Sequence, residues 1–105
     1  MKLEDFFIEL EKYMNIPVSY DHFKDTPTIP FIAYIDTGKN TFVADGRIYT
    51  KSRNIRIELY TAKKDFNLED KLESFLEDKF GVWEDDETIY IKEEDLFMHS
   101  YYVQI

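Results

Sequence analysis

The sequence predicts a single α+β domain, with two helices packed on one face of a mainly antiparallel or mixed sheet. Three observations lead to this fold class. Two segments carry apolar residues at helical spacing, several others alternate with a period of two, and short turn-rich connections replace regular strand–helix alternation. The length of 105 residues is typical of one domain, so we expect residues 1–105 to share one core.

The first helix is predicted over residues 2–14. Acidic residues crowd its first turns, where the positive end of the helix dipole favours them, and Pro17 prevents the helix from continuing. A short strand around Val18 and Tyr20 follows, and the proline-rich residues 24–30 form a connector, because proline lacks a ladder N–H. The apolar helix face consists of Leu3, Phe6, Phe7, Leu10 and Met14.

The middle of the chain predicts strands. Residues 31–36 are mostly apolar on both faces, which is typical of a central strand covered on two sides. Residues 37–47 contain Gly38, Asn40 and the pair Asp45-Gly46, which favour one or two reversals between short strands. Residues 48–62 follow as a strand with Ile55, Ile57 and Leu59 on its buried face and Arg56, Glu58 and Tyr60 on its wet face.

A second helix is predicted within residues 65–81, and further strands are predicted after it. Asp65 or Asn67 can cap the helix, and Gly81 lies where a left-handed residue would end it. Residues 82–105 indicate two or three strands, with a hairpin turn at residues 92–95. The buried helix face consists of Leu68, Leu72, Phe75 and Leu76.

The composition restricts the classes of function. With no cysteine, the chain has no disulfide, thiolate metal site or cysteine nucleophile, and this usage fits a reducing compartment. The N-terminal residues show neither the apolar core of a signal peptide nor a membrane span, so we expect a cytoplasmic, soluble protein. A formal net charge of -9 opposes non-specific binding to nucleic acid or to an anionic membrane.

One basic segment stands out in this acidic chain. Residues 39–64 carry seven basic and two acidic residues, a balance of +5, so the remainder carries -14. We interpret these cations as half of an interface whose acidic half, residues 84–87 or 93–95, lies on an identical neighbour. A nucleic-acid strand using Tyr49, Arg56 and Tyr60, and an ordinary mixed-charge surface, stay open as alternatives. The candidate interface residues are Lys51, Arg53, Arg56, Lys63 and Lys64.

The sequence favours a non-enzymatic protein. It contains no phosphate-binding glycine loop, nucleophile elbow, zinc-binding helix motif or calcium loop, so we predict no catalytic, cofactor-binding or metal-binding residue and no cofactor. His22 and His99 are best interpreted as histidines bonded to backbone or solvent. A small hydrolase or metal-dependent enzyme built from either histidine with carboxylates is a third hypothesis.

Several segments together resemble a family of small proteins encoded by prophages of low-GC Gram-positive bacteria. The resemblance covers nearly the whole chain and is most specific in "FVADGRIY", "IELYTAKKD" and the pattern formed by Glu87, Tyr90, Ile91 and Glu94. Members of that family are similar to tail terminator or tail completion proteins, which join heads and tails in long-tailed phages. These segments are typical of the family and form no catalytic signature.

The resemblance implies a structural role in the virion. It implies an α+β subunit that assembles in the host cytoplasm as a ring, commonly a hexamer, between the tail tube and the head connector, with no enzymatic activity and no cofactor. An acidic lumen would let DNA slide through such a ring without sticking. The alternative function is an acidic mimic of DNA that inhibits a host DNA-binding protein, for which the interrupting cations are unfavourable.

Overall fold

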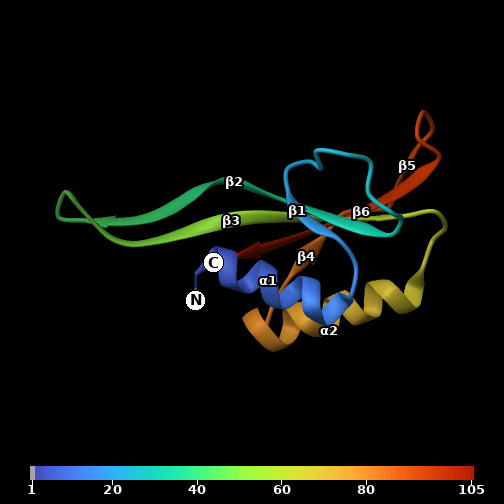
Figure 1. Cartoon of the computed structure of the whole chain (residues 1–105). Helices are drawn as coiled ribbons and strands as arrows, with labels where there is room; N and C mark the ends of the chain where they lie inside the picture. The colour runs from blue at the N-terminus through green and yellow to red at the C-terminus, as the bar shows by residue number, and fades with distance from the viewer. Residues whose placement is uncertain (1) are drawn as a thin grey trace.

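The computed structural model describes residues 2–105 and confirms the predicted α+β class. Two helices lie on one face of a six-strand mixed, mainly antiparallel sheet in a single domain (Figure 1). The strand order is β1-β2-β3-β6-β4, and β5 also pairs with β6. The elements are α1 (Leu3–Met14), β1 (Val18–Tyr20), β2 (Phe31–Ala44), β3 (Arg47–Thr61), α2 (Phe66–Phe80), β4 (Glu84–Asp85), β5 (Ile89–Ile91) and β6 (Leu96–Gln104).

Both helices form where the apolar spacing predicts them. Asp65 is the cap of α2, since its carboxylate accepts a hydrogen bond from the N–H of Leu68 at 3.0 Å. Gly81 ends that helix with φ +80°, and Asn15 ends α1 in the left-handed conformation at φ 57°. The predicted apolar faces therefore turn toward the sheet.

The core lies between the helices and the face of β3 that carries Ile55, Ile57 and Leu59. The alternating pattern of residues 55–59 is confirmed, because these three side chains are all buried. From α1, Phe6 contributes a ring to the core, and it packs against Phe75 of α2 at a centroid distance of 5.5 Å. The two helices thus share one apolar layer with the sheet.

The opposite face of β3 is less exposed to solvent than predicted. Glu58 was expected to be solvated, yet its side chain is buried and lies 3.3 Å from the guanidinium of Arg56. Tyr60 also bonds the Glu58 carboxylate and stacks on Phe31. Arg56 and Tyr60 on the same face hold the Glu58 carboxylate, and the connector before β2 passes over this face of the sheet (Figure 1).

The prediction of short strands in residues 37–47 is wrong. A single reversal at Asp45-Gly46 joins β2 of 14 residues to β3 of 15 residues. Asp45 and Gly46 have φ values of 52° and 75°, as the two central residues of a type I′ hairpin turn require. Gly38, expected to help reverse the chain, instead lies at a register shift within β2.

We predict that truncating the core face of α1 destabilises the protein far more than truncating its exposed face. Leu10 is fully buried, whereas Ile8 on the same helix is 53% exposed. Leu10→Ala should lower the free energy of unfolding by about 2–5 kcal/mol, and Ile8→Ala by roughly 0.5 kcal/mol or less. Urea titration followed by circular dichroism measures both changes; equal losses would contradict this core assignment.

Candidate functional site

The most unusual feature of the molecule is a two-stranded arm, which we define as residues 37–52. The strand β1 covers β2 only at residues 32–34, and β6 pairs with β3 only over residues 54–61, followed by Arg53–Ile105 backbone bonds. Beyond that point the β2–β3 hairpin continues alone, which gives the molecule principal extents of 51 × 27 × 26 Å (Figure 1). Both edges of the arm are therefore open for backbone pairing.

The end of the arm is apolar and exposed. Val43 pairs with Ile48 across the hairpin, and the rings of Phe42 and Tyr49 meet edge to face at 6.5 Å. These four side chains are 55–62% exposed. A two-stranded hairpin is only marginally stable in water, and clustered exposed apolar side chains indicate an interaction site. We call residues 42–49 the arm tip.

A polar cluster fixes the point where the arm leaves the body. Arg53 donates to the Asp36 carboxylate at 2.7 Å, and the other Asp36 oxygen accepts from the N–H of Gly38 at 3.0 Å. Arg53 and this backbone bond hold the pKa of Asp36 below its usual range. Asn40 also donates to the Asn54 side chain at 2.7 Å. The arm therefore projects in a defined direction from a rigid base.

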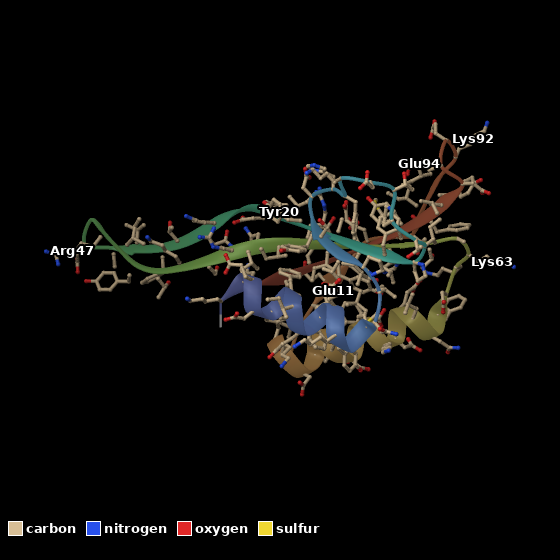
Figure 2. All side chains as sticks on the ribbon, in the orientation of Figure 1. Glu11, Tyr20, Arg47, Lys63, Lys92 and Glu94 are labelled. Atoms are coloured by element: carbon tan, nitrogen blue, oxygen red, sulfur yellow. The ribbon has the colours of Figure 1, made fainter. Side chains whose placement is uncertain are left out.

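The arm has the opposite charge to the rest of the chain. It carries Lys39, Arg47 and Lys51 against Asp45, a net charge of +2. Because the whole chain has a net charge of -9, the remaining residues have a net charge of -11. Arg47 lies at the far end of the arm, beyond every other labelled side chain (Figure 2). Such a charge distribution favours contact between the arm of one molecule and the body of another.

The structure does not bring the five predicted interface cations into one patch. Lys51 lies on the arm, and Arg53 is at its base, paired with Asp36. Lys63 lies at the opposite end of the molecule from Arg47 (Figure 2). Of the five cations, therefore, Lys51 alone belongs to the arm. The five are spread along the molecule because β3 is long and extended.

Two of the predicted cations are paired within the chain. Arg56 lies 3.3 Å from a Glu58 carboxylate oxygen, and Lys64 lies 2.8 Å from Glu69 of α2. Lys64 also donates to the hydroxyl of Thr88 at 2.7 Å. Because these intramolecular ion pairs already use the charges, Arg56 and Lys64 are poorer candidates for a partner than the arm cations.

The acidic segments predicted to face those cations are partly engaged as well. Asp85 pairs with His99 at 2.9 Å, and Asp86 accepts a hydrogen bond from the Tyr102 hydroxyl. Asp95 accepts a hydrogen bond from Tyr90 at 2.7 Å. Glu94 differs from these residues, since it is exposed and lines a cleft on the sheet face away from the helices.

This cleft has a volume of about 560 Å³ and lies beside Phe31, the first residue of β2. Its wall is the connector of residues 21–29, and its floor includes Ala33. Aromatic rings continue the floor: Phe31 stacks on Tyr60 at 4.7 Å and meets Phe23 edge to face at 5.3 Å, centroid to centroid. Aromatic floors with a few polar groups at the rim are typical of binding sites.

The buried His99 belongs to a polar network. Its Nδ1 atom lies 2.7 Å from the Thr88 hydroxyl, and its Nε2 atom lies 2.9 Å from Asp85. The order carboxylate, imidazole, hydroxyl resembles that of a nucleophilic triad, but Lys64 donates to the same hydroxyl oxygen, which links this corner to α2 through Glu69. We therefore interpret the network as a structural tie between the sheet and α2.

The other histidine lies at the surface. His22 contacts its neighbour Asp21 at 3.1 Å at the rim of the cleft, and its side chain is 79% exposed. Among residues 2–105, no group of three or more His, Asp or Glu side chains is arranged to hold a metal ion. These positions give the metal-dependent hypothesis no support.

Comparisons with known proteins do not indicate a function for this chain. No protein-family model matches the chain, and a search of curated proteins gives no significant match. In the part of the chain that the structure describes, no helix is long and apolar enough to cross a membrane. The resemblance to phage tail proteins therefore stays a hypothesis, to be weighed against the arm and the cleft.

We predict that Tyr60 in the cleft makes the protein sensitive to alkaline pH. Burial and the neighbouring Glu58 carboxylate raise the pKa of Tyr60 to about 12. The unfolded chain releases this proton near pH 10, so the stabilisation is complete below pH 10 and is lost as the pH rises toward 12. Tyr60→Phe should therefore lose less free energy of unfolding than the wild type between pH 9.5 and pH 11.5, as measured by urea titration. Parallel losses would contradict the assigned burial.

Proposed function

We propose that this protein is a non-enzymatic structural subunit of a phage or prophage tail, acting as a tail terminator or head-tail joining protein through ring assembly. The observation that supports this function best is the arm, residues 37–52. It projects without lateral support from the body, exposes apolar side chains at its tip and carries positive charge in an acidic protein. A monomer gains no packing from such an element, whereas a neighbour would cover it.

The arm suits a head-to-tail contact between identical subunits. Because its tip and the acidic body are different surfaces, one copy can engage the next with the same pair of surfaces, which closes into a ring when the rotation permits. A ring formed in this way keeps most of the -11 body charge outside the arm contacts. Acidic surfaces around a central channel would repel the DNA backbone and let it pass.

A DNA-binding ribbon is the second function that the arm supports. Two-stranded basic arms with aromatic side chains are a known way to contact DNA, and Arg47, Tyr49 and Lys51 supply those groups. The -11 of the remaining chain opposes the approach of a phosphate backbone. Binding of duplex DNA at physiological salt, measured by fluorescence anisotropy, would favour this function over the ring.

The DNA-mimic alternative finds less support in the shape of the molecule. A mimic needs carboxylates spaced like phosphates along an elongated surface. The elongated part here is the arm, whose balance is +2 and which contains one carboxylate, that of Asp45. We therefore rank this function below ring assembly.

We predict that removing the arm leaves the body folded and abolishes assembly. Replacing residues 38–52 by an Asn-Gly turn should preserve the circular dichroism signature of the folded body, because the arm contributes no side chain to the core. Light scattering should show wild-type assemblies, with about 76 kDa for a hexamer of the 12.7 kDa chain, and only monomer for the shortened variant. Equal masses for both proteins would contradict the proposed role of the arm in assembly.

A point variant at the tip should act in the same direction. Phe42→Ser combined with Tyr49→Ser removes both exposed rings and should raise the dissociation constant of the assembly about tenfold or more, since buried aromatic anchors dominate interface energies. Val82→Ser is the matched control, because Val82 is 76% exposed but lies outside the arm. An unchanged constant in the double variant would count against the tip.

The phage function itself is tested in the lysogen. Deleting the gene and inducing the prophage should give heads without tails, or tails of irregular length, in electron micrographs. Normal virions would overturn the proposed function, whatever the purified protein does in solution. Complementation with the arm-shortened variant should fail, and complementation with Val82→Ser should succeed.

A further inference from the structure

The cleft and the arm tip lie at opposite ends of the same ribbon. Phe31 in the cleft floor begins β2, and Ala44 at the tip ends it. At about 3.3 Å per residue, the 13 steps between them span roughly 43 Å. A molecule therefore cannot place its arm tip in its own cleft, whereas a second copy in head-to-tail orientation can.

The cleft and the tip are chemically complementary. The cleft carries three carboxylates, those of Asp21, Asp25 and Glu94, together with Lys24 and with His22, which contacts Asp21. The tip carries Arg47 and Asp45, and the planar guanidinium of Arg47 suits carboxylate partners. Below the rim, the stacked floor described above offers aromatic faces, and the tip offers the exposed rings of Phe42 and Tyr49.

Two other hollows of the described surface suit the tip less well. A hollow beside α2 contains Lys63 and Lys64, which would repel Arg47. Another, between Trp83 and Gln104, contains one carboxylate, that of Glu84. The acid-rich cleft is thus the better match in charge, and its floor is the aromatic stack.

We propose that the cleft of residues 21–33 with Tyr60, Glu94 and Leu96 binds the arm tip of a second copy of this chain. Arg47 lies among the rim carboxylates, and a ring of Phe42 or Tyr49 covers Phe31 and Tyr60. This inference rests on the proposed function, because it names the surface through which the ring closes. It also gives the acidic half of the interface a different place from residues 84–87.

Cysteine cross-linking tests the contact directly. The chain contains no cysteine, so Ile48→Cys on the tip and Lys24→Cys at the cleft rim each introduce a single thiol. Neither substitution removes a carboxylate or Arg47. A disulfide needs Cα atoms about 4.4–6.8 Å apart, so mild oxidation of an equal mixture should give a covalent dimer that neither variant gives alone. Ile48→Cys mixed with Lys12→Cys on α1 is the control and should stay monomeric on a non-reducing gel.

A charge exchange tests the ion pairs. Arg47→Glu should raise the dissociation constant of the assembly about tenfold, because it places a carboxylate among carboxylates. Adding Asp25→Arg to the same chain should recover most of that loss, whereas Lys12→Glu, the control for net charge, should leave the constant nearly unchanged. No recovery in the double variant would place Arg47 elsewhere.

The outcomes separate this inference from the proposed function. If wild-type protein assembles but Lys24→Cys does not cross-link to Ile48→Cys, the cleft is wrong and ring assembly stands. If the wild type forms no oligomer at any concentration, the contact between copies is overturned, while the lysogen deletion still decides the phage function. A mixed disulfide together with recovery by Asp25→Arg supports the proposal in both respects.

Discussion

The backbone ladder between β2 and β3 is the constraint on which the whole structure depends. Within the body, β3 pairs on both sides, and its apolar face of Ile55, Ile57 and Leu59 forms the floor of the core under both helices. The same ladder continues past the body as the arm. The β2–β3 hairpin therefore forms part of the core sheet and also the whole arm. The hydrogen bonds that fix its register in the body also fix where the arm tip lies.

This continuity explains the polar cluster at the base of the arm. A ribbon that leaves the sheet loses the side-chain packing that stabilises β pairs. Asp36 compensates for that loss by holding Arg53 and the backbone of Gly38 at the point of departure. We interpret two of the predicted cations, Arg53 and Arg56, as parts of the scaffold that supports the arm, since both are paired with carboxylates of their own chain.

The surface beyond the core follows a simple division. Polar networks, such as the one around His99, tie the edges of the sheet to α2 and use their charges internally. Four exposed apolar side chains, those of Phe42, Val43, Ile48 and Tyr49, lie together at the arm tip, where neither strand has a further neighbour. Other exposed apolar side chains, such as Phe66 and Val82, lie on the body. This arrangement leaves the arm tip as a surface that a partner could cover. The proposed ring contact and the proposed cleft both depend on the exposure of the arm tip.

The sequence by itself determined the two helices, the end of α2 at Gly81, the apolar face of β3 and the turn at residues 92–95, because each depends on local spacing or on one residue type. The structure decided that Asp65 and not Asn67 caps α2, and that Asn15 ends α1. It also located the basic segment, although not its shape. Only the tertiary structure decided that residues 37–52 form an arm, since an exposed strand and a covered one can share the same local pattern, and what differs is whether a neighbouring strand is present. The cleft was likewise invisible, because Phe23, Phe31, Tyr60 and Glu94 come from separate segments that only folding brings together.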